Sequence, residues 1–118
     1  MDQALETILK KKAKNILFVL NDHIADGTDV SWIWDIDIET LVQISTIRLT
    51  LSGERVYDLS LRFKYANADM NTITIESDVN LAINKSLMQT GSQETLYILA
   101  TYTAMLEVRK LLTGKGIL

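Results

Sequence analysis

The sequence has no cysteine and no proline, and only one histidine among its 118 residues. Without cysteine, neither a disulfide framework nor a thiolate metal site can form. The absence of disulfides fits a cytoplasmic protein. No apolar run approaches the roughly 20 residues that span a bilayer. The charged segment from Met1 to Lys14 lacks the apolar core of a signal peptide. We therefore expect a cytoplasmic protein without a transmembrane segment.

Lysine and arginine are absent from one long segment, Asn15 to Ile47. This segment carries the histidine, both tryptophans and six acidic residues: Asp22, Asp26, Asp29, Asp35, Asp37 and Glu39. The net charge of −3 argues against nucleic acid as a partner. Because acidic and aromatic residues are concentrated here, the segment is the first candidate for a functional site.

Phosphate-binding motifs are absent as well. Neither GxxxxGKS/T nor GxGxxG occurs, and Gly114-Lys115-Gly116 follows an expected helix rather than a strand. We therefore expect no nucleotide, other cofactor or metal to bind this domain. A phosphoacceptor receiver domain would need a lysine after its last strand, where this sequence has Thr101-Tyr102-Thr103.

Strand-like and helix-like patterns alternate along the chain. Apolar and β-branched runs predict strands over Ile16–Leu20, Ile44–Leu51, Thr72–Ile75 and Thr95–Ala100. Helical spacing predicts helices over Asp2–Ala13, Arg55–Tyr65 and Tyr102–Leu112, and one through Val79, Ile83 and Leu87 that Ser77 or Asp78 caps. The alternation predicts a single domain, residues 1–118, with a mostly parallel sheet in a three-layer α/β/α Rossmann-like fold.

The tryptophan-bearing segment begins where the first predicted strand ends. In open α/β sheets, ligands and partners meet this carboxyl edge. One interpretation is structural: Asp29 or Ser31 begins a short helix, and Trp32 or Trp34 fills the edge of the core. The other is functional, because an aspartate such as Asp35, held beside a tryptophan, can fix the tautomer and orientation of a histidine in a catalytic triad.

Three stretches resemble the C-terminal domain of the MurT family. The first is Ala25-Asp26-Gly27 with Asp29 and Ser31-Trp32-Ile33-Trp34-Asp35. The second runs from Leu99 to Glu107, with Arg109 after it. A weaker third contains Gly53, Arg55, Asp58, Leu61-Arg62 and Tyr65-Ala66. They occur in the family's order and extend over Ile16 to Leu112.

The resemblance implies a domain of a Mur-ligase-like subunit that pairs with a GatD-type glutaminase. The glutaminase releases ammonia from glutamine with a cysteine and a histidine. The ligase subunit uses ATP and magnesium to activate the D-glutamate of the lipid II stem peptide, which ammonia converts to D-isoglutamine. The ATP-binding central domain is absent here, so we expect a detached C-terminal domain that is not active alone.

By position in the motif, the resemblance implies that Asp35, or alternatively Asp29, completes the glutaminase triad. The residues expected to contact the partner or substrate are Asp26, Ser31, Trp32, Trp34, Thr101 and Tyr102. Two other functions stay open: a purely structural Mur ligase domain that closes over substrate, and a stand-alone α/β module for a small ligand.

Overall fold

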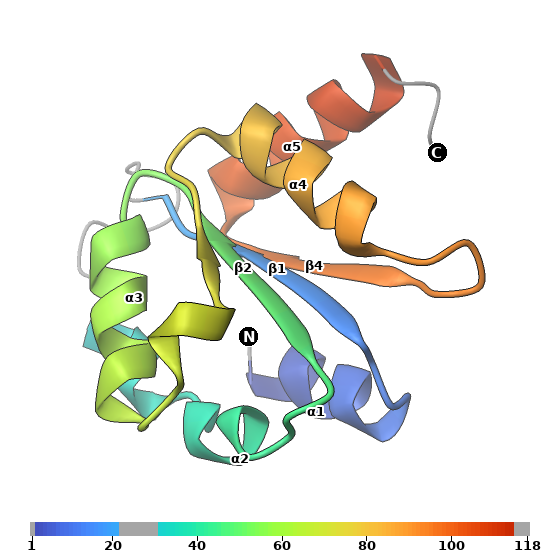
Figure 1. Ribbon diagram of the computed structural model, residues 1–118. Coiled ribbons are helices and arrows are strands. Elements are labelled where there is room, and N and C mark those ends of the chain that lie inside the picture. Colours follow the sequence, from blue (N-terminus) through green and yellow to red (C-terminus); the bar gives the residue numbers. More distant parts are fainter. Residues whose placement is uncertain (1, 22–30, 115–118) are drawn as a thin grey trace.

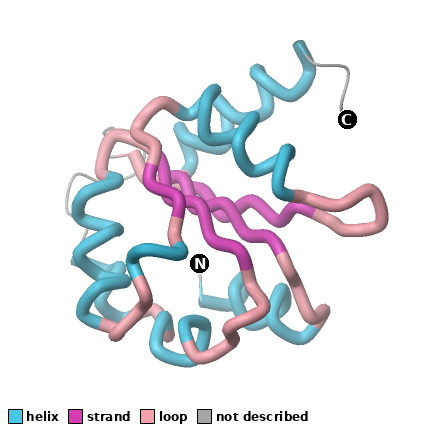
Figure 2. The backbone as a smooth tube through the Cα atoms, in the orientation of Figure 1, coloured by secondary structure: helices cyan, strands magenta, loops and turns pink. Residues whose placement is uncertain are grey.

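The computed structural model describes residues 2–21 and 31–114 (Figure 1). Within these residues, the strands form one parallel sheet in the order β3-β2-β1-β4 (Figure 2). The strands are β1 (Asn15–Val19), β2 (Arg48–Ser52), β3 (Thr74–Ile75) and β4 (Leu96–Ala100). Val19 lies opposite both Ser52 and Ala100, so the carboxyl ends of the three longer strands are level at one edge.

Helices cover both faces of the sheet. On one face lie α1 (Asp2–Lys10), the short α2 (Ile38–Val42) and α3 (Val56–Tyr65), and on the other lie α4 (Val79–Gln89) and α5 (Tyr102–Gly114) (Figure 1). Alternate side chains of β1 explain why both faces need cover, since successive residues of a strand point to opposite sides. Ile16 and Phe18 pack with α1 and α3, while Leu17 and Val19 pack with α4 and α5. The predicted three-layer α/β/α fold is confirmed.

The local predictions hold where a strand or helix has a clear pattern. Asp78 caps α4, since its Oδ1 accepts a hydrogen bond of 3.1 Å from the backbone N–H of Leu81. The predicted strand from Ile44 to Leu51 is wrong in its first half, because residues 44–47 form the turn that follows α2. Neither α2 nor the short 3₁₀ helix η3 (Met70–Thr72) was predicted, and η3 shortens the third strand. Among the described residues, none of the helices combines the length and the apolar composition that a membrane span needs.

A polar network closes the amino edge of the sheet. Glu94 Oε1 accepts hydrogen bonds from the backbone N–H of Gly91 at 2.8 Å, from Asn15 Nδ2 at 3.0 Å and from Arg48 Nη1 at 3.0 Å. Arg48 also donates to the Asn15 side chain and to the backbone carbonyl of Gln89. The Gly91 N–H, then Asn15 and Arg48, lower the pKa of Glu94 from its ordinary 4.5 to about 2.

This lowered pKa predicts a pH dependence of stability. A carboxyl whose pKa is depressed on folding stabilises the folded state fully above its unfolded value of 4.5, and the contribution is lost as pH falls through about 2. We expect Glu94→Gln to lower the urea midpoint relative to wild type at pH 7, and the difference to shrink as pH falls from 5 towards 2. Urea denaturation of both proteins across this range measures it. A difference that stays constant down to pH 2.5 would refute the assignment.

Candidate functional site

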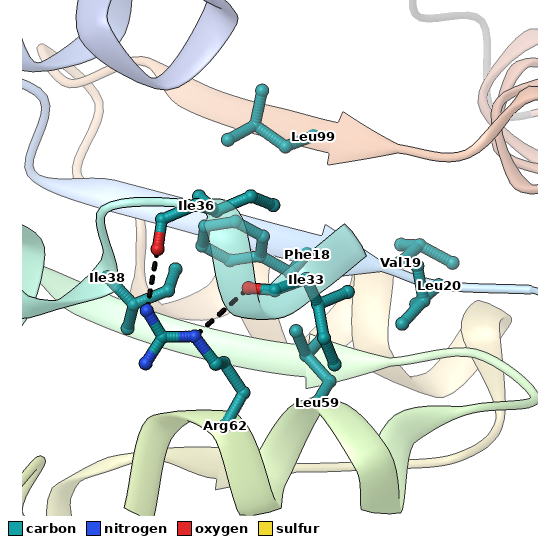
Figure 3. A pocket seen from close by; sticks show the side chains of 9 residues that line it. All are labelled: Phe18, Val19, Leu20, Ile33, Ile36, Ile38, Leu59, Arg62 and Leu99. Carbon is teal, nitrogen blue, oxygen red and sulfur yellow. Dashed lines mark hydrogen bonds between the residues drawn. The ribbon is translucent and has the colours of Figure 1, made fainter. Parts of the chain in front are cut away.

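The Ser31–Asp35 segment forms a short 3₁₀ helix, η2, that packs on the sheet face beside α3. In a 3₁₀ helix, residues three apart lie on the same side. Ile33 and, just past the helix, Ile36 are therefore both buried in the core with Phe18 (Figure 3). Trp34 and Asp35, between them, are exposed. The local geometry thus anchors the turn by two isoleucines and presents the tryptophan and the aspartate outward.

Arg62 of α3 bonds this turn through its guanidinium group. Its side chain is only 3% exposed, yet it carries a full charge. Its Nε donates to the Ile33 carbonyl at 3.0 Å, and its Nη2 donates to the Ile36 carbonyl at 2.6 Å (Figure 3). Nη1 and Nη2 also donate to the two carboxylate oxygens of Glu39, at 2.9 and 2.7 Å. This contact with Arg62 lowers the pKa of Glu39 below its ordinary value.

The pocket drawn in Figure 3 is part of the core rather than a ligand site. It is lined by apolar side chains and Arg62, and its volume is about 10 Å³. That is about the space of one water molecule. Its residues therefore support the turn and do not receive a substrate.

Trp34 is the exposed aromatic side chain next to the predicted catalytic acid. It is 46% exposed, and its ring meets Tyr65 edge-on at 5.5 Å. The guanidinium carbon of Arg62 lies 5.5 Å from the centre of the Trp34 ring. One side of the indole is thus held by a ring and a cation, and the rest faces solvent. A half-exposed, fixed tryptophan is what an interface anchor requires.

A stripe of apolar side chains continues from Trp34 along the outer face of α3. Tyr57, Leu61 and Tyr65 are four residues apart, a spacing that places them on one side of a helix. All three are exposed, Tyr57 at 76% and Tyr65 at 69%. We call Trp34, Tyr57, Leu61 and Tyr65 the aromatic stripe. Its length along α3 gives a surface for a macromolecular partner rather than for a small ligand.

The carboxyl edge of the sheet holds a second feature. The chain continues from β1 to β2 on one side, whereas β4 lies on the other side of β1, so a switch point falls between β1 and β4. There the backbone N–H of Asn21 donates to Thr101 Oγ1 at 3.0 Å. An open cavity of about 540 Å³ lies beside it, lined by residues that include Asn21, Gly53, Asp78, Asn80, Thr103 and Glu107. The first turns of α3, α4 and α5 surround this cavity.

The structure places the predicted contact residues in two separate groups. Trp34 contacts Tyr65 of α3, Asp35 is exposed beside it in the chain, and neither residue lines the cavity at the carboxyl edge. Thr101 is buried at that edge, and Tyr102 is exposed at the start of α5. Among the described residues, no hydrogen bond, ion pair or ring contact joins the two groups. The sequence predicted that all of these residues lie at one edge of the sheet. The packing of η2 onto the sheet instead separates Trp34 and Asp35 from Thr101 and Tyr102.

Other predicted residues lie beyond what the structure describes. Asp26 and Asp29 fall within residues 22–30, outside the described residues. Ser31 and Trp32 belong to the backbone of η2, but their side chains are not described. In the described part of the chain, no group of three or more histidine, cysteine or acidic side chains could hold a metal ion.

Arg62 is the residue whose role sequence reasoning missed. It was noted only as part of the weaker match in the middle of the chain. A signal was present, because Arg62 lies three residues after Leu59 and directly before Phe63, on the buried side of α3. A charged side chain on an apolar helix face needs a partner when it is buried. The position of Arg62 therefore predicts a contact with backbone carbonyls or with an acidic side chain.

Comparison with known proteins gives a consistent result. The model of the family described as "MurT ligase C-terminal" matches residues 1–105. A relative in Streptococcus pneumoniae, "Lipid II isoglutaminyl synthase (glutamine-hydrolyzing) subunit MurT", is 34% identical over 98% of this chain and 26% of its own length. The protein of the same name in Staphylococcus aureus is 34% identical over 75% of this chain and 20% of its own length. The chain thus spans about a quarter or less of these relatives. The chain belongs to the MurT ligase C-terminal family.

Proposed function

We propose that this chain is the C-terminal domain of a lipid II isoglutaminyl synthase subunit, docks a GatD-type glutaminase, and supplies Asp35 to the glutaminase active site. One observation carries the proposal: Asp35 is exposed on a turn whose Ile33 and Ile36 side chains are buried in the core and whose carbonyls accept hydrogen bonds from Arg62 of α3. The family match and the subunit named in the relatives support the wider assignment. Asp29 is the alternative acid.

The chemistry assigned to Asp35 follows from what a triad acid does. The glutaminase cysteine attacks the side-chain amide of glutamine, and its histidine takes the thiol proton and returns it to the leaving ammonia. A carboxylate that accepts a hydrogen bond from the far nitrogen of that histidine selects the tautomer and stabilises the imidazolium. An exposed aspartate on a fixed turn can perform this role in trans once the partner docks.

The remaining steps belong to other parts of the complex. ATP with magnesium would activate the D-glutamate carboxyl of the stem peptide in the central domain, and ammonia would form the amide there. This domain holds neither nucleotide nor metal in the proposal, and the reaction takes place in the cytoplasm, where ATP and glutamine are supplied.

The aromatic stripe next to Asp35 is the docking surface in this proposal. We expect Trp34→Ala, in the full-length protein that carries this chain, to weaken glutaminase binding by roughly 30-fold, because a central tryptophan anchor contributes about 2 kcal/mol. Titration calorimetry with the GatD-type glutaminase measures the affinity, and thermal melting checks that the variant is folded. The control is Met88→Ala, which should bind like wild type. Met88 is an exposed apolar residue of α4, in the helical layer on the other face of the sheet.

The outcomes separate docking from its absence. Weaker binding of the Trp34 variant with an unchanged Met88 variant supports the stripe as the interface. Equal binding of both variants and wild type means that the partner docks elsewhere. A wild-type protein that does not bind the glutaminase at all contradicts the proposed function.

One observation favours a second role at the carboxyl edge of the sheet. The cavity of about 540 Å³ at the switch point is lined by polar side chains and by the starts of three helices. This is where open α/β sheets receive ligands. A substrate-closing domain without a catalytic group would use this cavity, and in that case Asp35 variants would leave glutamine hydrolysis unchanged.

A further inference from the structure

One backbone carbonyl before Asp35 and one after it both accept hydrogen bonds from the guanidinium of Arg62. Ile33 O accepts from Arg62 Nε at 3.0 Å, and Ile36 O accepts from Arg62 Nη2 at 2.6 Å. Just past η2, the bond from the Ile36 N–H to the Ile33 carbonyl is long, at 3.4 Å. The carbonyls that flank Asp35 are thus both bonded to a side chain of α3, and Arg62 lies 27 residues after Asp35 in the chain.

Stability alone does not require an arginine at this place. Replacing a buried ion pair with apolar side chains of similar volume is often neutral or stabilising, because burying the charges is unfavourable. Arginine supplies instead a rigid planar set of donors that fixes several acceptors relative to one another. Here those acceptors are two carbonyls of the turn and both carboxylate oxygens of Glu39, which lies in α2 after the turn.

A group that must meet a catalytic histidine tolerates little displacement, since a shift of about 1 Å can reduce turnover by roughly 100-fold. We propose that Arg62 is a positioning residue for Asp35: its guanidinium sets where the Ser31–Asp35 turn presents this carboxylate to the glutaminase. This inference rests on the proposed function. Arg62 itself is buried and touches neither glutamine nor the reacting atoms in this arrangement.

Lysine is the informative replacement. A lysine keeps the positive charge, but a single ammonium cannot span two carbonyls and a carboxylate in a fixed plane. In the assembled complex of the full-length protein and glutaminase, we expect Arg62→Lys to lower kcat for glutamine hydrolysis by about 10- to 100-fold. KM for glutamine should stay within about twofold, because glutamine binds on the partner subunit.

A double variant distinguishes positioning from general damage. If Arg62 acts through Asp35, the Arg62→Lys/Asp35→Asn double variant should be no slower than Asp35→Asn alone. Arg48→Lys is the matched control, because Arg48 also bonds a backbone carbonyl and a carboxylate, but at the amino edge of the sheet. It should lower the melting temperature and leave kcat unchanged.

Each result has a separate meaning. If Asp35→Asn leaves hydrolysis unchanged, the proposed function fails, and the role of Arg62 fails with it. If Asp35→Asn slows hydrolysis but Arg62→Lys does not, or if the two effects multiply, only the positioning role is overturned. Should Arg62→Lys fail to fold in thermal melting, Glu39→Gln replaces it: a loss of kcat that disappears in the Asp35→Asn background supports the inference, and an unchanged kcat refutes it.

Discussion

Replacing Asp35 by asparagine is expected to lower kcat for glutamine hydrolysis by about 100-fold or more in the complex of full-length ligase subunit and glutaminase. Asparagine has nearly the same shape, so docking should be retained. It has no negative charge to stabilise the imidazolium, and its amide can hold the wrong histidine tautomer. Release of glutamate and ammonia measures the rate, and calorimetry confirms that the complex still forms.

Two companion variants make this result specific. Asp29→Asn tests the alternative acid; if it slows hydrolysis and Asp35→Asn does not, the role moves to Asp29. Glu6→Gln removes an exposed acid of α1 that forms an ion pair with Lys10, 3.4 Å away, and should leave hydrolysis unchanged. If both aspartate variants hydrolyse glutamine at the wild-type rate, the domain contributes no acid to the triad.

The sequence predicted the fold because its strands carry strong local patterns. The continuous apolar run from Ile16 to Leu20 indicated a strand covered on both faces, and Ser77 or Asp78 before an apolar pattern indicated a helix start. Such signals depend only on neighbouring residues. They were sufficient for the parallel sheet and its two helical layers.

The prediction failed where a long-range contact decides the local structure. Residues 44–47 are rich in β-branched side chains, but β2 begins only at Arg48, which pairs with Asn15 of β1 and joins the network around Glu94. The five-residue helix α2 is too short to show a periodic pattern. Its visible signal was Asp37, whose Oδ1 accepts from the Thr40 N–H at 3.1 Å.

The site was predicted in composition but not in geometry. The motif pointed to Trp34 and Asp35, and both are exposed on one turn. Its placement beside α3 depends on Ile33 and Ile36 entering the core and on Arg62 bonding their carbonyls. No local rule relates residue 62 to residues 33–36, so the separation of this turn from the cavity at the carboxyl edge was visible only in three dimensions.

Gly53 sits where the backbone of β2 turns past the end of β1, and replacing it with alanine is expected to destabilise the fold strongly. Its φ of +103° is a conformation that side chains rarely adopt, and an added Cβ would lie 2.4 Å from the Leu20 carbonyl oxygen. That oxygen is held by the Arg55 N–H at 2.9 Å, and the Leu20 N–H is bonded to the Ser52 carbonyl at 3.0 Å. Neither strand end can move without breaking these bonds.

We therefore expect Gly53→Ala to lower the free energy of unfolding by about 3 kcal/mol or more, from the backbone strain of a positive φ and the clash with a fixed carbonyl. Urea denaturation at pH 7 measures it. Gly91→Ala is the matched control: its added Cβ would meet side-chain atoms of Glu94 at 3.2 Å and no backbone atom, a contact that a shift of a few tenths of an ångström relieves, so the loss should stay below about 1 kcal/mol. A Gly53 variant as stable as this control would mean that β1 and β2 can separate at their carboxyl ends. The cavity that Gly53 lines beside Asn21 would then have a deformable wall rather than a fixed one.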